Sequence, residues 1–149
     1  MITNNIVDYK YTSDNFFSLL ETNDLNLSTT YEWDIIFIDG LHHAEQVGKD
    51  IKNALDHIVE GGFILLHDCN PISYDAQLVP RQTVAWNGDV WKSVVKLRHT
   101  NPKLSINVVD TDWGVGIIKI GKQELYNKEN LNKCLDYNYF KDNREELLN

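Results

Sequence analysis

The chain has 149 residues, of which 42% are hydrophobic and 24% are charged. This length and composition predict one globular domain, residues 1–149, with a core of its own. The 22 acidic residues outnumber the 14 basic ones and give a net charge of −8, which repels a phosphate backbone. We therefore expect no nucleic-acid partner.

The sequence contains no sign of secretion or of a membrane anchor. It lacks a basic segment, an apolar core and a cleavage site at the N-terminus, and no apolar run approaches the ~20 residues of a membrane span. The two cysteines, Cys69 and Cys134, do not have the spacing of a metal or redox motif, which is typical of a reducing compartment. We expect a cytoplasmic protein with no membrane partner and no disulfide.

The first 31 residues predict a strand, a short helix and a loop. Residues 6–11 alternate loosely between apolar and polar side chains, which favours a half-exposed strand. The Thr12-Ser13-Asp14 turn is typical of a helix N-cap, and residues 23–31 are polar enough for a loop. The apolar face of the short helix consists of Phe16, Phe17, Leu19 and Leu20.

Residues 33–71 have the pattern of two strands joined by a helix. Residues 35–38 and 63–66 are short, unbroken apolar runs, as expected of strands buried on both faces. Between them apolar side chains recur every three or four positions, and we expect Gly61-Gly62 to end that helix. The pattern predicts two parallel strands. The apolar positions of the helix are Ala44, Val47, Ile51, Ala54, Leu55 and Ile58.

Polar residues follow each of these two strands directly. Asp39 and His42 come after the first strand, and His67 and Asp68 come at the end of the second. Because the carboxyl ends of parallel strands meet at one edge, where open α/β sheets bind ligands, we expect the four side chains to converge. Two carboxylates and two imidazoles suit a divalent metal or acid–base chemistry.

Simpler interpretations of these residues stay open. Asp39 would also serve as a turn residue that binds backbone amides, and His42 as the cap of the helix that begins near Ala44. His67 would also suit a hydrogen bond to a neighbouring loop. A metal-dependent hydrolase built on the His67-Asp68 pair is a further alternative, although hydrolases named for such a pair carry it on helices.

The second half of the chain predicts a loop, a helix, a hairpin and a helical tail. Residues 70–85 have no usable period and are expected to form a loop over the carboxyl edge of the sheet. Trp86-Asn87-Gly88-Asp89 is expected to start a helix that ends near Asn101. Residues 104–109 and 115–120 predict a β-hairpin. The tail, residues 122–149, is expected to be part of the same domain, helical from about Asn127 and amphipathic over 137–148.

Four blocks of sequence resemble a known family. They are F-I-D-G-L-H-H-A-E-Q-V, E-G-G-F-I-L-L-H-D-C-N-P, W-N-G-D-V-W-K and V-V-D-T-D-W-G-V-G-I-I. In this order, over residues 12–120, they are similar to the C-terminal part of class I S-adenosylmethionine-dependent methyltransferases, in the branch of O-methyltransferases that act on sugars, macrolides and catechols. The resemblance implies an α/β fold with an incomplete Rossmann-like sheet, mostly parallel, with a C-terminal antiparallel hairpin and helices on both faces.

The resemblance also implies a reaction and roles for individual residues. The reaction is the transfer of a methyl group from S-adenosylmethionine to a hydroxyl of a small molecule or sugar. A divalent metal would be held by Asp39 and Asp68, with His67 as a further ligand, and the catalytic pair would be His42, as general base, with Asp39. Histidine donors would favour zinc, manganese or iron over magnesium. The cofactor contacts implied are Ser13, Asp14, Asp39 and Gly40.

One departure from the family bears on partners. Relatives carry a G-x-G-x-G turn ahead of these blocks, whereas the glycines of this chain begin at Gly40. Without the neighbouring strand, residues 35–39 would form an open apolar edge. We expect this edge to be covered by residues 6–11, by a second copy in a homodimer, or by a separate polypeptide that carries the missing half. The alternative function is therefore a catalytically inactive remnant or split half that acts as an interaction or oligomerisation module.

Overall fold

The computed structural model describes residues 7–149 and divides the chain after Tyr31 into two compact units. In the first unit the helix α1, Ser13–Glu21, begins after Thr12, whose hydroxyl accepts a hydrogen bond from the backbone N–H of Asn15 (3.3 Å). The predicted cap is confirmed. Residues 7–11 are not a strand: the hydroxyl of Tyr9 donates to the carbonyl of Leu25 (3.2 Å), and no strand among the described residues pairs with this segment. Residue 6 of the predicted strand lies outside the described residues.

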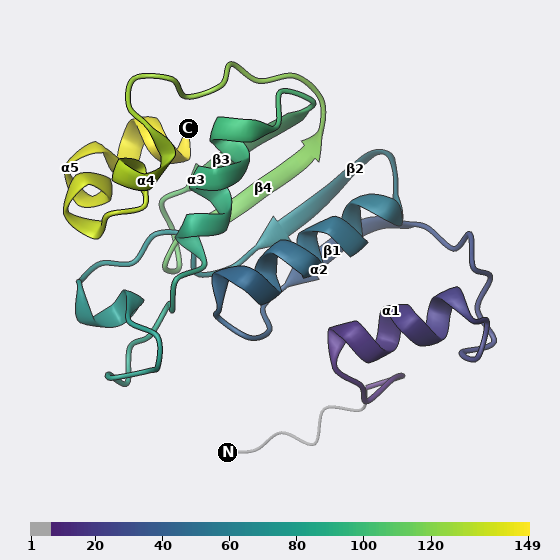
Figure 1. Cartoon of the computed structure of the whole chain (residues 1–149). Helices are drawn as coiled ribbons and strands as arrows, with labels where there is room; N and C mark the ends of the chain where they lie inside the picture. Colours follow the sequence, from purple (N-terminus) through teal and green to yellow (C-terminus); the bar gives the residue numbers. More distant parts are fainter. Residues whose placement is uncertain (1–6) are drawn as a thin grey trace. The chain divides into compact units, whose positions relative to one another are not determined.

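The second unit, Glu32–Asn149, contains a four-stranded sheet and its helices (Figure 1). Both predicted parallel strands and the predicted hairpin are confirmed. The elements are β1 (Trp33–Ile38), α2 (Ala44–Asp56), β2 (Ile58–Leu66), the short 3₁₀ helix η1 (Asp75–Gln77), α3 (Trp91–Thr100), β3 (Leu104–Val109), β4 (Val115–Ile120), α4 (Leu131–Cys134) and α5 (Tyr137–Leu148).

The strands lie in the order β1-β2-β4-β3. β1 and β2 are parallel, with Ile38 opposite Leu66, whereas β4 is antiparallel to both β2 and β3. The α/β class and the partial Rossmann-like sheet with a terminal antiparallel hairpin are therefore confirmed. The sheet is not mostly parallel over these four strands, because only one of its pairings is parallel and β1 is an edge strand within the described residues.

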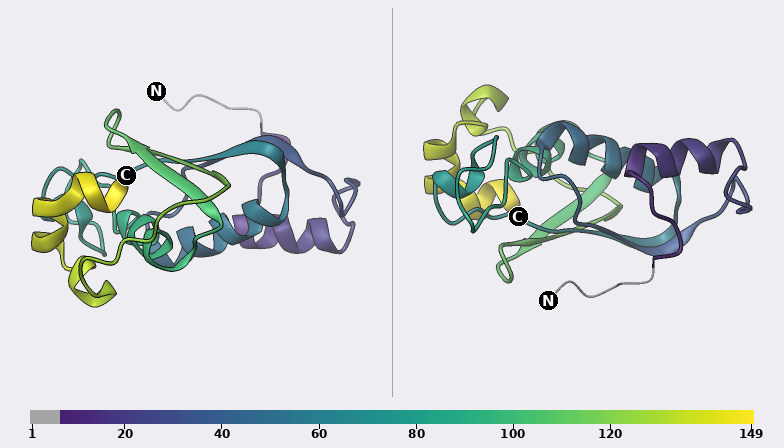
Figure 2. Two further views of the ribbon diagram at one scale, coloured as in Figure 1. Left: turned by 90° about the horizontal axis from the view of Figure 1, so that it is seen from above. Right: turned by 90° about the horizontal axis from the view of Figure 1, so that it is seen from below.

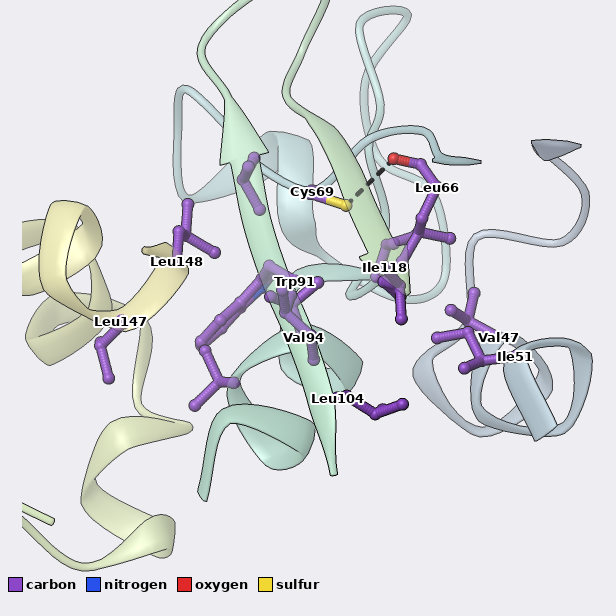
Figure 3. Packing of buried hydrophobic residues seen from close by; sticks show 14 of the residues in the cluster. Val47, Ile51, Leu66, Cys69, Trp91, Val94, Leu104, Ile118, Leu147 and Leu148 are labelled. Atoms are coloured by element: carbon purple, nitrogen blue, oxygen red, sulfur yellow. Dashed lines mark hydrogen bonds between the residues drawn. The ribbon is translucent and has the colours of Figure 1, made fainter. Parts of the chain in front are cut away.

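The helices of the second unit pack on one face of the sheet (Figure 2). Alternate residues of each strand point into this core: Ile64 of β2 and Ile118 of β4 are fully buried. They meet Ile51 of α2 and Val94 of α3, and Trp91 fills the space between the sheet and α5 (Figure 3). Each such side chain removed from water stabilises the fold by ~1.5–3 kcal/mol, so this face holds the sheet and its helices together.

The other face of the sheet remains exposed near β1, so the expected burial of residues 35–38 and 63–66 on both faces is wrong. Ile35 is 59% exposed, Phe37 57% and Phe63 40%, because alternate strand residues point away from the helices. Within the described part of the second unit, the helices that contribute to the hydrophobic core pack on the opposite face of the sheet. The expectation of helices on both faces therefore stays a prediction for the second face.

The predicted end of the helix at Gly61-Gly62 is wrong. α2 ends at Asp56, and both glycines lie inside β2. The register passes from Trp33 opposite Ile58 to Ile35 opposite Phe63, so β2 bulges there. Gly61 has a φ of +83°, and a Cβ on Gly62 would lie 2.8 Å from the carbonyl oxygen of Asp34, so the glycines accommodate the bulge.

The C-terminal tail is helical only in part. α5 matches the predicted segment 137–148, and α4 is a single turn that begins after Asn130 instead of near residue 127. Asn130 caps α4 by accepting from the N–H of Lys133 (3.0 Å), which fixes the later start. Among residues 7–149, no helix has both the length and the apolar character needed to cross a bilayer.

Candidate functional site

Four polar side chains meet where β1 and β2 end. The pairing of Ile38 with Leu66 sets residue 39 beside residue 67, and the N–H of His67 donates to the carbonyl of Ile38 (3.0 Å). The predicted convergence of Asp39, His42, His67 and Asp68 is therefore confirmed as geometry, and their roles stay predictions.

The carboxylates and imidazoles lie within ion-pair distance of one another. The Nε2 atom of His42 is 3.4 Å from Oδ1 of Asp39 and 3.2 Å from Oδ2 of Asp68. The Nδ1 atom of His67 is 3.5 Å from the same Asp39 oxygen and 3.0 Å from the same Asp68 oxygen. One oxygen of each carboxylate thus faces both imidazoles.

His42 is held in place by the loop that precedes α3. Its Nδ1 atom lies 3.1 Å from the carbonyl oxygen of Trp86, which can only accept, so Nδ1 carries the proton. The imidazole stacks on the Trp86 ring, with ring centroids 5.0 Å apart. His42 does not cap α2: Oδ1 of Asp89 accepts the N–H of Ala44 (2.7 Å) instead. The Nε2 atom of His42 is left to face the carboxylates.

Asp68 is the most buried group of the site. Its residue is 5% exposed, and its φ of +63° places it in the left-handed region, which costs a non-glycine residue of order 1 kcal/mol. Asn87, which is fully buried, donates from Nδ2 to Oδ1 of Asp68 (2.7 Å). This amide is the only side-chain hydrogen bond to Oδ1 within the described residues.

The hairpin between β3 and β4 also reaches the site. Oδ2 of Asp112 lies 3.3 Å from Nε2 of His67, so the ring of His67 has carboxylates on both sides. The backbone of the hairpin loop is fixed by the strand end, because the N–H of Asn70 donates to the carbonyl of Trp113 (2.8 Å). A Cβ on Gly114, where φ is +89°, would lie 2.5 Å from that Asn70 nitrogen, so the close approach requires glycine.

The surroundings shift two pKa values upward. Burial lowers the pKa of His67, but the attraction of Asp68 and hydrogen bonds to Asp68 and Asp112 outweigh it, so the pKa is raised above 6.5. Burial also raises the pKa of Asp68, against the opposing effect of His42 and His67. The site therefore holds its protons more tightly than the unfolded chain does.

The amide beside Asp68 does not come from the neighbouring positions in sequence. The thiol of Cys69 points into the core, where it donates to the carbonyl of Leu66 (3.2 Å), and burial raises its pKa to about 12 (Figure 3). The side chain of Asn70 instead bonds Asp110 (3.0 Å) and Arg144 (2.7 Å). Neither residue contributes a side chain to the site.

A cavity of about 600 Å³ opens over the four residues. This volume lies within the range of small-molecule sites, and two indole rings contribute apolar surface to it. Its lining consists of Asp39, His42, His67, Asp68, Val84, Ala85, Trp86 and Trp113.

Sequence reasoning missed Asn87, Asp89 and Asp112. Residues 86–89 were expected to start a helix, yet α3 begins at Trp91 and Gly88 has a φ of +62°. The Asn87-Gly88 dipeptide is a turn signal that would have indicated a loop at this position. Ser13 and Asp14, expected to contact the cofactor, lie in the first turn of α1 in the other unit.

Residues 6–69 match the family model of a methyltransferase domain. This part of the chain is similar to methyltransferase domains. The match covers β1, α2 and β2 and includes Asp39, His42, His67 and Asp68, so the resemblance seen in the motifs is confirmed for this part of the chain. A search of curated proteins gives no match.

The raised pKa of His67 predicts a pH dependence of stability. His67 stabilises the fold fully below the unfolded pKa near 6.5, and this contribution is lost as the pH rises through the higher folded-state pKa. In urea unfolding with a chelator present, the wild type should lose more free energy of unfolding between about pH 6 and about pH 9 than His67→Gln does.

The control variant is His99→Gln, whose imidazole lies away from the site and contacts the carbonyls of Val95 and Glu129. It should keep the pH dependence of the wild type. If the free energy of unfolding of His67→Gln has the same pH dependence as that of the wild type, His67 is not the group responsible.

Proposed function

We propose that the chain is part of an S-adenosylmethionine-dependent O-methyltransferase that acts on a hydroxyl of a small molecule or sugar. The observation that carries the proposal is the position of His42 Nε2, which lies 3.4 Å from Asp39 and 3.2 Å from Asp68 in the lining of a cavity, while Nδ1 contacts the carbonyl of Trp86. The match of residues 6–69 to a methyltransferase domain supports the reaction class.

His42 is the proposed general base. In the tautomer with the proton on Nδ1, Nε2 keeps a lone pair in the lining of the cavity and can accept the proton of an acceptor hydroxyl. Asp39 and Asp68 lie 3.4 and 3.2 Å from this nitrogen, so their negative charges stabilise the imidazolium that forms. The pair of His42 and Asp39 thus has the arrangement of a base and its charge partner.

The donor set also fits a divalent cation. Oxygens of Asp39 and Asp68 and a nitrogen of His42 all lie within 4.8 Å of one another, and His67 Nδ1 is close to the same two oxygens. We assign the ion to Asp39 and Asp68 with His67 as third ligand, which leaves His42 as base. A bound ion would supply acidity to the acceptor hydroxyl, and the imidazole donor favours zinc, manganese or iron.

The acceptor is proposed to be a small molecule with a flat or apolar face. The cavity of about 600 Å³ has a polar floor of carboxylates and imidazoles and walls from Trp86 and Trp113. An indole wall suits the ring of a sugar or an aromatic acceptor, whose hydroxyl then points toward His42. The loop residues Val84 and Ala85 border the same cavity and contribute to its shape.

The cofactor is proposed to contact Asp39 and Gly40 after β1, and the contacts with Ser13 and Asp14 stay predictions from the resemblance. A Cβ on Gly40 would meet nothing within 4 Å, so the backbone there is open to a ligand. Residues 7–38 contain no glycine, and so no Gly-rich turn, to approach the cofactor closely. The buried free thiols of Cys69 and Cys134 suit the proposed cytoplasmic location.

Calorimetric titration with S-adenosylhomocysteine tests the proposal, and heat of binding is expected at about 1 mM ligand. With an acceptor found by screening, His42→Gln should lower kcat by about 10²–10⁴-fold with cofactor affinity unchanged, because only proton transfer is lost. The matched control is His57→Gln, at the far end of α2, which should keep wild-type activity.

The absence of any heat, for the chain alone and for each of its oligomers, would refute the enzyme proposal. A His42→Gln variant that is as active as the wild type would refute the role of the base alone.

A second candidate function is an interaction module, and the open edge of the sheet favours it. β1 pairs only with β2 among the described strands, and Ile35 and Phe37 are more than half exposed. An unpaired, apolar edge strand without lysine or proline is a template for pairing with another chain. We propose that a second copy of the chain, or a separate polypeptide that supplies the missing half, covers β1.

Light scattering tests this candidate. The 17.3 kDa chain should have twice that mass in solution, or should recover a partner in a pull-down. Charges on the edge should abolish the association, so the double variant Ile35→Asp/Phe37→Asp is expected to be monomeric. Val109→Asp, at the other edge of the sheet, should behave as the wild type. A strict monomer without a partner would rule the candidate out.

A further inference from the structure

The segment 86–89 contacts both reactive groups of the site from outside the two strands. It lies between the 3₁₀ helix η1 and α3, and the N–H groups of Asn87 and Gly88 donate to the carbonyl of Ala76 (2.9 and 3.1 Å). This short segment is therefore anchored by its own backbone before its groups reach His42 and Asp68.

The contact with His42 is made at Nδ1, whereas Nε2 lies near the two carboxylates. Nδ1 of His42 lies within hydrogen-bond distance of the carbonyl oxygen of Trp86 (3.1 Å). The backbone N–H of Asp89 donates to the carbonyl of His42 (3.2 Å). The two backbones approach so closely that a Cβ on Gly88 would lie 1.9 Å from the carbonyl oxygen of His42. The ring of His42 is thereby fixed, with Nε2 facing Asp39 and Asp68.

In the contact with Asp68, too, segment 86–89 bonds one polar atom of the side chain and leaves the other facing the site. The Nδ2 atom of Asn87 donates to Oδ1 of Asp68 (2.7 Å) and lies 3.4 Å from the carbonyl of Trp113, so both neighbours accept and the amide orientation is determined. Because Oδ1 is occupied, Oδ2 of Asp68 is the oxygen that faces His42 (3.2 Å) and His67 (3.0 Å).

We propose that Asn87 is a positioning residue that presents Oδ2 of Asp68 to the site, while Trp86 presents Nε2 of His42. The roles of Oδ2 of Asp68 as a metal ligand and of Nε2 of His42 as a base rest on the proposed function, whereas the positioning of the two atoms does not. Two features show that Asn87 is held for this contact: it is fully buried, and its Oδ1 atom has no hydrogen-bond partner within the described chain. A buried amide that leaves its acceptor unpaired is costly unless the donor side makes a strong, charge-assisted bond.

The role predicts an effect on the site that packing alone would not have. Asn87→Ala removes the donor, and Asn87→Asp keeps the shape but places an oxygen against Oδ1 of Asp68. Both should change the imidazole nitrogen signals of His42 and His67 in long-range ¹H–¹⁵N spectra of the full chain. Both should also weaken Mn²⁺ binding, measured by calorimetry, by about 10–100-fold, as expected when the partner of a metal ligand is lost.

The matched control is Asn143→Ala, which removes an amide donor that bonds the carbonyl of Tyr139 (2.9 Å) in α5. It should leave the imidazole signals and the Mn²⁺ affinity at wild-type values. If folded Asn87→Ala and Asn87→Asp proteins keep the wild-type signals of His42 and His67, the proposal is overturned.

Two further outcomes also distinguish the role of Asn87 from the proposed function. If neither variant folds, the wild type is compared with Asp68→Ala: a shift of the Asn87 side-chain amide signal supports the contact, and an unchanged signal overturns it. If the wild type binds no Mn²⁺ or no S-adenosylhomocysteine, the proposed function loses its metal or its cofactor, whereas the imidazole spectra still decide the role of Asn87.

Discussion

The site depends on the parallel pairing of β1 with β2. With Ile38 opposite Leu66, the residues that follow the two strands lie side by side, and Asp39 and Asp68 share two imidazoles. Since side chains alternate between the faces of a strand, a slip of one residue would turn this set to the other face of the sheet. The buried residues Ile64 and Leu66 oppose such a slip, because they would leave the core. The packing of the sheet and the chemistry of its rim are thus set by one register.

The rim concentrates negative charge that a cation would compensate. Carboxylates of Asp39, Asp68 and Asp112 surround His67, and the unprotonated Nε2 of His42 would face two of them. A proton on His67 relieves the repulsion between these carboxylates, and a divalent ion would do the same. The raised pKa of His67 shows that the carboxylates favour a proton on this imidazole. The proposed metal would compensate the same negative charge. Both follow from the same geometry.

The strands, α2, α3 and the hairpin were predictable because their apolar residues recur with the spacing of a helix or form the short runs of a strand. The convergence of Asp39 and Asp68 followed from strand direction alone. Gly61-Gly62 misled because glycine serves both a helix end and a bulge, and only the strand register distinguishes them. Asn87 was not predictable as a partner of Asp68, since their contact spans 19 positions and depends on how a loop without a period returns to the strand end. Asp112 reaches His67 in the same way, through the tip of a hairpin.

The proposed cation site joins Asp39 and Asp68, which follow different strands. The most direct measurement is an anomalous difference map of crystals grown with Mn²⁺. The account predicts one peak within about 2.0–2.3 Å of an oxygen of each carboxylate, with an imidazole nitrogen of His67 completing the site. A map without a peak between the two carboxylates, or with Asp39 and Asp68 turned away from each other, would contradict it.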